Sequence, residues 1–346
     1  MRVWLVGFGT VGRWVARALD AEAERLAARY GVGITVVGIA NARDGFVHDE
    51  NGLDLGLAAG ARSLADLPGA RRWDTAIEGL RATEADLLVE VAASPAGDGE
   101  PGYTHMREAL ERGIPVVTSN KWPVALHGVE LAELARRRGV AFRAESTVMS
   151  GTPLLAALVD GLAGAVPIGL RGLLNATANF ILTRMTEGRT YEEALAEAQA
   201  AGLAERDPAA DVEGHDTMAK VMILSALLFG RQLRREQVAC RGITDLDRDA
   251  IDRAAARGGR MKHVATLAFS APDGRGDVSA RVQPELVPAG DPLAGIEGTV
   301  NAVVCRASPL GEVTIAGPGA GPELAGLGVF SDVIAVARAR AAARVR

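Results

Sequence analysis

The 346-residue chain has few of the residues that hold together small extracellular or metal-bound domains. It contains only two cysteines, Cys240 and Cys305, and no CxxC motif, so a disulfide scaffold and a thiolate metal site are unsupported. Its five histidines lack the spacing of metal ligands. It also lacks the uninterrupted apolar run of about 18 residues that a membrane-spanning helix needs. These absences predict a soluble protein of a reducing cytoplasm, with no membrane partner.

Positive charge is scarce as well. The 38 lysines and arginines are outnumbered by 43 aspartates and glutamates, and no basic cluster precedes the tail at 337–346. A nucleic-acid-binding protein would carry a basic patch, so nucleic acid is excluded as a partner. The arginines of the tail suit the C-terminal end of a helix, where they complement the helix dipole; an interaction patch is the alternative.

The first 145 residues alternate apolar runs with amphipathic segments. Strands are expected at 2–9, 34–40, 86–93, 115–120 and 140–146, with helices between most of them, including a short one at 63–67, and a loop at 41–45. Continuous apolar strands separated by helices are typical of a parallel sheet covered on both faces. Right-handed crossovers then predict an α/β domain with a Rossmann-type doubly wound parallel sheet.

The pattern changes from about residue 146. Helices are expected at 152–165, 178–188, 190–201 and 216–230, and the chain becomes rich in strands after 260. This is typical of an α+β domain with an open, largely antiparallel sheet. The predicted organisation is a dinucleotide-binding domain at 1–145, a substrate-binding and dimerisation domain at 146–312, and a C-terminal segment at 313–346 that returns to the first domain.

A glycine-rich motif, Gly7-Phe8-Gly9-Thr10-Val11-Gly12, follows the first strand and opens a helix. In this context G-x-G-x-x-G predicts a dinucleotide site; a glycine turn kept for packing is the alternative. Gly7 would make the tight turn, Gly9 would let a pyrophosphate approach the backbone, and Gly12 would allow close helix–strand packing. The helix N-terminus favours the phosphates.

The choice of cofactor depends on the end of the second strand. NAD sites usually place an acid there to bind the ribose 2′-OH, but this chain has Asn41 and Arg43. Because Arg43 could pair with a 2′-phosphate, NADP is favoured; dual use of NAD, or Arg43 as a solvated loop residue, stays open.

A second motif, "TSNK" at 118–121, places Lys121 just after a parallel strand. Ligands of open α/β sheets bind at this edge, and Thr118, Ser119 and Asn120 offer hydrogen-bonding groups near the nicotinamide end. A surface lysine at the start of a helix is the alternative.

Acidic residues gather in a third segment, at 205–216. Asp207 precedes a proline, which favours a loop, so Glu205 and Asp211 can converge there. Asp216 and Lys220 are four apart and share one face of a helix whose later turns are apolar. An exposed pair would contribute only about 0.3–0.5 kcal/mol. The surplus of carboxylates instead suits a substrate with an ammonium group, and a partly desolvated lysine suits proton transfer.

Through these motifs the chain resembles the homoserine dehydrogenase family, in its short form without a C-terminal ACT domain. The resemblance covers nearly the whole chain through 173–185, 193–220, "TSNK", 295–303 and "GPGAG" at 317–321. It implies the reversible NAD(P)-dependent interconversion of L-homoserine and L-aspartate 4-semialdehyde in threonine and methionine biosynthesis.

The resemblance also implies roles for residues at matching positions. It makes Lys220 the proton donor, with Lys121 and Asp216 as further catalytic residues. It assigns the substrate to Glu205, Asp211 and Thr177. The cofactor-binding residues are then Gly7, Gly9, Thr10, Val11, Gly12, Asn41, Arg43, Ser94, Thr118, Ser119, Lys121 and Gly321.

Family members often bind a monovalent cation such as Na⁺ or K⁺. The matching ligands are the Glu145 side chain and the carbonyls of Val148, Ser150 and Thr152, an oxygen-only set. An apolar second domain with one sheet face to cover indicates a homodimer. The chain departs from the family pattern at four positions: Ala176, His215, Pro322 and Ala325.

Two other dehydrogenase classes and one non-enzymatic function are the alternatives. An aspartate-semialdehyde dehydrogenase needs a cysteine nucleophile with a base, and a 2-hydroxy-acid dehydrogenase needs a His–Asp pair with an arginine; neither set is found. The alternative from another class is a catalytically inactive Rossmann-type protein that binds NAD(P) and senses redox state. Such a sensor would have no use for the acids around Lys220.

Overall fold

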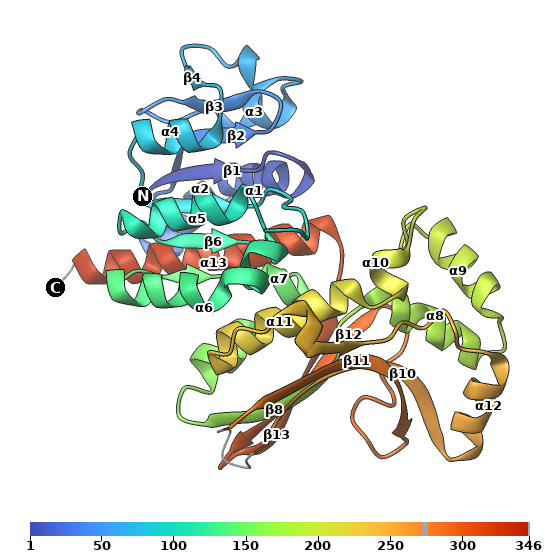
Figure 1. Ribbon diagram of the computed structural model, residues 1–346. Helices are drawn as coiled ribbons and strands as arrows, with labels where there is room; N and C mark the ends of the chain where they lie inside the picture. Colours follow the sequence, from blue (N-terminus) through green and yellow to red (C-terminus); the bar gives the residue numbers. More distant parts are fainter. Residues whose placement is uncertain (271–275, 345–346) are drawn as a thin grey trace. The chain divides into compact units, whose positions relative to one another are not determined.

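The computed structural model describes residues 1–270 and 276–344, so the end of the arginine-rich tail, 345–346, lies outside the described residues (Figure 1). The chain divides into two compact units. Unit 1 comprises Met1–Gly151 and Gly321–Arg346, and unit 2 comprises Thr152–Ala320. The boundaries expected from the sequence, after 145 and after 312, lie N-terminal to these divisions. Within the described ranges, no helix combines the length and the apolar content that a bilayer crossing requires.

Unit 1 contains a seven-stranded sheet with the order β4-β3-β2-β1-β5-β6-β7. In the part of the sheet with the order β2-β1-β5-β6-β7, all pairs are parallel. At one edge, β3 pairs antiparallel with β2 and β4 pairs antiparallel with β3. The strands are β1 (Arg2–Val6), β2 (Thr35–Asn41), β3 (Gly45–His48), β4 (Arg71–Trp73), β5 (Leu87–Glu90), β6 (Val116–Thr118) and β7 (Phe142–Arg143).

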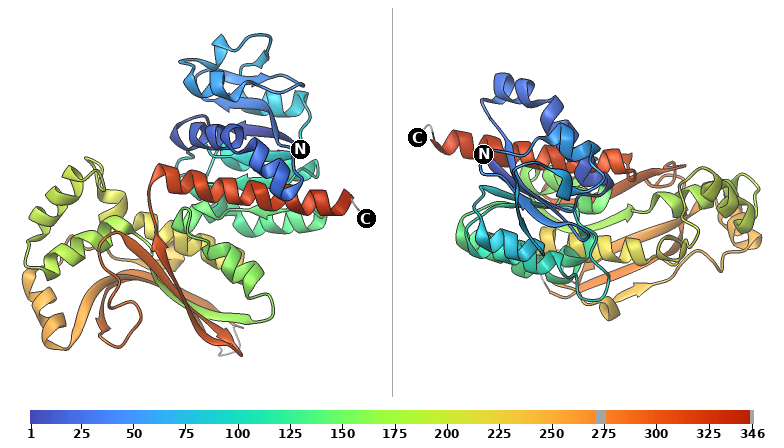
Figure 2. Two further views of the ribbon diagram at one scale, coloured as in Figure 1. Left: turned by 180° about the vertical axis from the view of Figure 1, so that it is seen from behind. Right: turned by 90° about the horizontal axis from the view of Figure 1, so that it is seen from above.

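Helices cover both faces of this sheet, as the doubly wound fold requires. Alternate residues of β1 serve the two cores: Val3 and Leu5 pack with one set of helices, and Trp4 and Val6 with the other. The first set contains α1 (Thr10–Ala21), α2 (Ala23–Tyr30), α3 (Leu55–Gly60) and α13 (Pro322–Arg344); the second contains α4 (Ala76–Ala82), α5 (Gly102–Glu111) and α6 (Lys121–Arg138). Figure 2 shows α13 running along the face that α1 covers. The short α7 (Ser146–Met149) also packs against α13.

At the edge formed by β3 and β4, the structure differs from what the sequence predicted. The loop expected at 41–45 is a turn at 42–44, but β3, which begins at Gly45, and β4 were not expected. The helix expected at 63–67 is only a 3-10 turn, η1 (Leu64–Asp66). Gly45 has φ +73, and a Cβ there would lie 2.2 Å from the Trp73 carbonyl oxygen, so the β3–β4 pairing depends on glycine at this position. A strand of four residues is too short to leave a clear periodic signal.

Unit 2 has a six-stranded sheet with the order β13-β12-β8-β10-β11-β9, antiparallel except for the β11–β9 pair. Its strands are β8 (Val166–Leu173), β9 (Val238–Cys240), β10 (Gly259–Phe269), β11 (Val278–Pro288), β12 (Val300–Ser308) and β13 (Gly311–Pro318). Its helices are α8 (Ala176–Thr186), α9 (Tyr191–Ala200), α10 (Ala209–Val212), α11 (His215–Phe229) and α12 (Arg248–Ala256), with the 3-10 turn η3 (Arg235–Gln237). The helix expected at 152–165 is mainly a π-helical segment, η2 (Ala156–Gly161).

Helices α8 and α11 lie on one side of this sheet (Figure 1). The first turns of both helices therefore come to the region where β8 ends. This is the part of unit 2 that carries most of the polar residues singled out in the sequence.

Candidate active site

The turn between β1 and α1 has the geometry that a dinucleotide pyrophosphate needs. Gly7 has φ +98, and a Cβ there would lie 2.2 Å from the backbone nitrogen of Ala92. A Cβ on Gly12 would lie 2.0 Å from the Gly7 carbonyl oxygen, whereas one on Gly9 would have no neighbour within 4 Å. The backbone at Gly9 is thus open to a ligand, beside the first N–H groups of α1, which begins at Thr10.

The turn between β2 and β3 carries an acid that was not among the predicted cofactor residues. Asp44 is a buried side chain whose carboxylate accepts hydrogen bonds from Asn41 Nδ2 at 2.9 Å, Arg43 Nε at 3.0 Å, Ser63 Oγ at 2.8 Å and the Leu64 nitrogen at 3.0 Å. Hydrogen bonding from Arg43 is the largest cause that holds the pKa of Asp44 well below its usual range. The carboxylate therefore organises the loop, while 65% of the Arg43 side chain is exposed beside it.

At the ends of β5 and β6, several predicted cofactor residues use their side chains inside the protein. Thr118 Oγ1 donates to the Glu90 carbonyl oxygen at 2.7 Å, and Ser94 Oγ accepts from Asn120 Nδ2 at 2.8 Å. Both hydroxyl-bearing residues are buried, and Ser119 is half-buried. Lys121 is the first residue of α6. Contacts of this edge with a cofactor would thus come largely from the backbone and from Lys121.

In unit 2, Lys220 and Asp216 form a buried ion pair on α11. Lys220 Nζ lies 2.8 Å from Asp216 Oδ2, and only 9% and 11% of the two side chains are exposed. Lys220 Nζ also donates to the carbonyl oxygen of Leu174 at 2.6 Å. An ammonium buried to this extent is held in place by its acceptors, so its Nζ has a fixed position.

Asn175 connects this pair to a second acid, and the sequence analysis missed it. Its Nδ2 donates to Asp211 Oδ1 at 2.6 Å and to Asp216 Oδ2 at 3.2 Å, while its Oδ1 accepts from the Ala178 nitrogen at 2.8 Å as the N-cap of α8. One amide thus caps a helix and joins two carboxylates. An asparagine directly before the first residue of a helix is the available signal, because it is a typical N-cap.

The other predicted substrate residues lie in different environments. Thr177 is buried and its Oγ1 donates to the carbonyl oxygen of Leu203 at 2.8 Å. Glu205 is exposed, and its side chain forms no ion pair among the residues that the structure covers. Asp211 and Asp216 are half-buried. The structure thus joins Asp211, Asp216 and Lys220 in one network through Asn175 and the ion pair.

All four departures from the family pattern lie in the first turn of a helix. Pro322 is the first residue of α13, where proline is well tolerated because the N–H it lacks has no partner within the helix. Ala325 donates its backbone N–H to the Gly321 carbonyl oxygen at 2.9 Å, and Gly321 has φ +120. Ala176 is buried at the start of α8, and His215 is exposed at the start of α11.

The residues predicted to bind a cation belong to both units. In unit 1, Glu145 and Val148 are buried, and Ser150 has φ 52 and ψ −114, a rare conformation for a residue other than glycine. In unit 2, Thr152 Oγ1 donates to the Pro318 carbonyl oxygen at 2.9 Å. No group of three or more His, Cys, Asp or Glu that could hold a metal ion occurs in the chain as far as the structure describes it.

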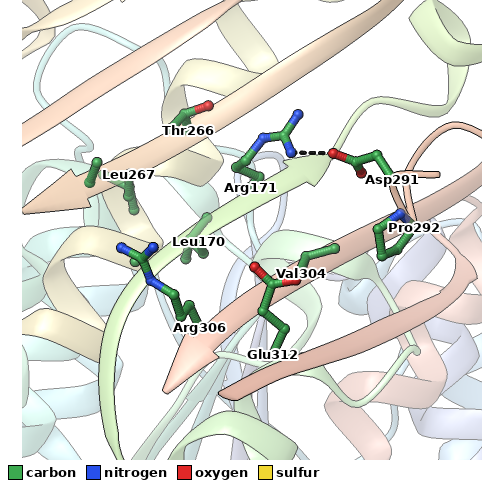
Figure 3. A pocket seen from close by; sticks show the side chains of 11 residues that line it. Leu170, Arg171, Thr266, Leu267, Asp291, Pro292, Val304, Arg306 and Glu312 are labelled. Carbon is green, nitrogen blue, oxygen red and sulfur yellow. Dashed lines mark hydrogen bonds and ion pairs between the residues drawn. The ribbon is translucent and has the colours of Figure 1, made fainter. Parts of the chain in front are cut away.

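A hollow of about 270 Å³ opens on the sheet of unit 2 (Figure 3). Arg171 forms an ion pair with Asp291 across it, and Arg306 and Glu312 also line it. None of the predicted substrate or cofactor residues is among its lining residues. The hollow therefore belongs to a different part of unit 2 from Lys220 and Asp216.

Comparisons with known proteins agree on one family. The model of the homoserine dehydrogenase family matches residues 153–334, and that of the homoserine dehydrogenase NAD-binding domain matches 7–145. The NAD(+)-dependent homoserine dehydrogenase of Pseudomonas canavaninivorans is 40% identical over 334 residues, covering 95% of this chain and 94% of the relative. The homoserine dehydrogenase of Methanocaldococcus jannaschii is 35% identical over 339 residues, covering 96% and 98%.

Solved structures give the same result. The putative homoserine dehydrogenase from Archaeoglobus fulgidus superposes with a TM-score of 0.85 at 32% identity, covering 97% of this chain and 99% of that one. A hyperthermophilic archaeal homoserine dehydrogenase in complex with NADPH superposes with a TM-score of 0.79 at 31% identity, covering 97% of each chain.

Proposed function

The chain belongs to the homoserine dehydrogenase family, whose members are NAD(P)-dependent oxidoreductases acting on a CH–OH group, and we propose that it interconverts L-homoserine and L-aspartate 4-semialdehyde through Lys220. This reaction would serve the biosynthesis of threonine and methionine. The buried ion pair between Lys220 and Asp216, joined through Asn175 to Asp211, is the observation that carries the assignment of residues. A redox sensor without catalytic activity is not favoured, because the relatives are named as dehydrogenases.

The chemistry divides between cofactor and protein. When bound, the nicotinamide supplies or accepts the hydride at the substrate carbon. In the reductive direction, Lys220 Nζ gives a proton to the aldehyde oxygen; in the oxidative direction, it takes the proton from the hydroxyl group. Asp216 accepts a hydrogen bond from Nζ and keeps the ammonium oriented. Lys121 is the second catalytic group of the proposal.

The carboxylates of unit 2 would bind the α-ammonium group of the substrate. Asp211 is half-buried and already accepts a hydrogen bond from Asn175, so its position is fixed before substrate arrives. Glu205 is exposed and would have to turn toward the substrate on binding. Thr177 supports the site by tying α8 to the carbonyl oxygen of Leu203.

Cofactor choice is proposed to favour NADP, with NAD as a second cofactor. The acid near the end of β2, Asp44, is occupied by donors of its own loop, whereas the exposed guanidinium of Arg43 can meet a 2′-phosphate. Arg43→Ala should lower kcat/KM for NADP by about tenfold, the size of a lost charged contact, with little change for NAD. Arg107→Ala, which removes another exposed ion-paired arginine of unit 1, is the control. A wild-type enzyme that prefers NAD would contradict the proposal.

Three further properties are proposed. The protein would be cytoplasmic, in keeping with Cys240 and Cys305, which are both free thiols. It would form a homodimer through the face of the unit 2 sheet that exposes Arg306, because such a mixed-charge surface can pair with itself. A monovalent cation would bind the Glu145 carboxylate and neighbouring carbonyls; the unusual backbone of Ser150 supports this, since such conformations gather at functional sites.

The decisive experiment follows the nicotinamide absorbance with homoserine as substrate, using NADP and NAD in parallel. Turnover with homoserine is the expected result. Cofactor binding without turnover would overturn the dehydrogenase proposal and favour the sensor. Sedimentation velocity on the same preparation measures the oligomeric state, and a monomer at micromolar concentration would contradict the dimer.

A further inference from the structure

A buried polar network lies under the carboxyl ends of β5 and β6, and its centre is Glu90. This last residue of β5 is fully buried. Its Oε1 accepts hydrogen bonds from the Ala92 nitrogen at 3.0 Å and from Asn120 Nδ2 at 3.4 Å, and its Oε2 lies 2.9 Å from His105 Nδ1. A carboxylate removed from water is costly unless it is well supplied with donors, and here three segments of the chain supply them.

Asn120 extends the network to Ser94. Its Nδ2 donates to Ser94 Oγ at 2.8 Å, and its Oδ1 accepts from the Ser94 nitrogen at 3.3 Å. Asn120 is the N-cap of α6, yet its side chain makes no capping hydrogen bond there. The amide thus holds the loop after β5 instead of the helix that it precedes.

The network is closely packed as well as hydrogen-bonded. A Cβ on Gly102, the first residue of α5, would lie 2.5 Å from Asn120 Nδ2 and 2.8 Å from Ser94 Oγ. The Gly102 nitrogen also donates to Ser94 Oγ at 3.3 Å. Because His105 lies one turn later on the same helix, α5 fixes the network from one side at two points.

The groups held by the network border the dinucleotide site. Ala92, which is bonded to Glu90, is the residue that a Cβ on Gly7 would strike. Asn120 directly precedes Lys121. Ligands of open α/β sheets bind at the carboxyl ends of the strands, and β5 and β6 end here. The network therefore joins the loop at 92–94 to the start of α6, and the same loop packs closely against the glycine turn.

We propose that Glu90, His105 and Asn120 are positioning residues that fix the backbone at 92–94 and the start of α6, and so set where the nicotinamide ring and Lys121 lie. The inference rests on the proposed dehydrogenase function. They act through other groups and need not touch the substrate. Hydride transfer depends steeply on the placement of the reacting atoms, so a small shift of this assembly would lower kcat.

Substitutions at His105 test the inference, because one of them keeps the hydrogen bond. His105→Leu removes the donor to Glu90, whereas His105→Asn places Nδ2 near the position of Nδ1. Thr83→Val is the control: it deletes another buried hydrogen bond of unit 1, from Thr83 Oγ1 to the Gly79 carbonyl oxygen at 2.8 Å, away from this edge of the sheet.

Three quantities are measured for each variant: kcat with homoserine, the Kd of NADPH, and the Kd of 2′-phospho-ADP-ribose, which lacks the nicotinamide ring. His105→Leu should lower kcat by about tenfold or more and weaken NADPH, while binding of the ring-less analogue changes by less than about twofold. His105→Asn should restore most of the loss. Thr83→Val should lower the melting temperature without changing kcat.

A His105→Leu variant with a reduced melting temperature but unchanged kcat and unchanged NADPH binding would overturn the inference, since the network would then serve stability alone. Equal weakening of NADPH and the analogue would overturn it too. If His105→Leu does not fold, Gly102→Ala replaces it, because Gly102 has no positive φ and the nearest neighbours of an alanine Cβ there are Asn120, Ser94 and the Pro123 ring of α6. If the wild type turns over no homoserine, the proposed function fails, and the ratio of the two Kd values still decides the positioning role.

Discussion

Replacing Lys220 by methionine separates the structural and the chemical contributions of the buried ion pair. The methionine fills most of the same volume but removes the ammonium that lies 2.8 Å from Asp216 Oδ2. Asn175 Nδ2, at 3.2 Å, still donates to the carboxylate. Leaving a buried charge without its counter-ion costs about 3–5 kcal/mol. The carboxyl can instead take up a proton, and with an ordinary pKa of about 3.9 this costs about 4 kcal/mol at pH 7.

The variant should therefore be about 3–4 kcal/mol less stable than the wild type at pH 7. In the variant, burial without the cation raises the folded-state pKa of Asp216 above the unfolded value, so the penalty is present at neutral pH and shrinks as the pH falls. At pH 5 protonation of Asp216 costs only about 1.5 kcal/mol, so the loss of stability at that pH cannot exceed this value. Urea unfolding at both pH values measures it, and turnover should fall roughly 10²-fold or more at each.

The double variant Lys220→Met/Asp216→Asn is the matched control, since it has no buried charge left in the pair. It should regain most of the stability and none of the turnover. A stability penalty that is equal at pH 7 and pH 5 would refute the argument from the unpaired carboxylate. A double variant with restored turnover would refute the role of Lys220 as proton donor.

Other positions give shorter tests. Burial lowers the pKa of Lys262 to about 8, so between pH 8 and 10.5 the folded protein binds fewer protons than the unfolded chain. The free energy of unfolding of the wild type should therefore rise relative to that of Lys262→Met between pH 7 and 10, by up to about 3 kcal/mol, as urea titrations will measure. Gly12→Ala should cost about 1–3 kcal/mol of stability and abolish NADPH binding, whereas Gly9→Ala, with open space for its Cβ, should lose NADPH affinity alone, as fluorescence titration will measure. Hydrogen bonding from Arg43 lowers the pKa of Asp44, so its carboxylate stabilises the fold above about pH 4, and the advantage of the wild type over Asp44→Asn in unfolding midpoints should shrink below that pH.

The alternation of strands and helices in unit 1 could be predicted because each central strand is buried on both faces and reads as a continuous apolar run. The glycine turn could also be predicted, because the close contacts at Gly7 and Gly12 leave no room for a side chain and so require glycine at this spacing. The β3–β4 edge could not be predicted. Its strands have four and three residues, and their pairing depends on a contact between Gly45 and the distant Trp73.

In the candidate site, the sequence indicated the pair of Asp216 and Lys220 because helical spacing places residues four apart on one face. It could not show how deeply the pair is buried, or that Asn175 connects it to Asp211 across 36 residues of sequence. Glu90 had one local signal, a single acid within the apolar run 87–93, but its partner His105 is 15 residues away on another element. Contacts of this kind follow from tertiary packing, which periodicity does not encode.

The divided construction of unit 1 has a consequence for synthesis on the ribosome. Its last helix, α13, contributes Val329, Phe330 and Val333 to the same core as Val15 of α1. Chains emerge from the N-terminus, so this helix follows only after all of Thr152–Ala320 has been translated. During that interval an apolar surface on the nascent dinucleotide-binding unit stays open to water or to a chaperone. We expect a stalled nascent chain that ends near residue 320 to bind a chaperone that recognises apolar surface, and the completed chain to release it.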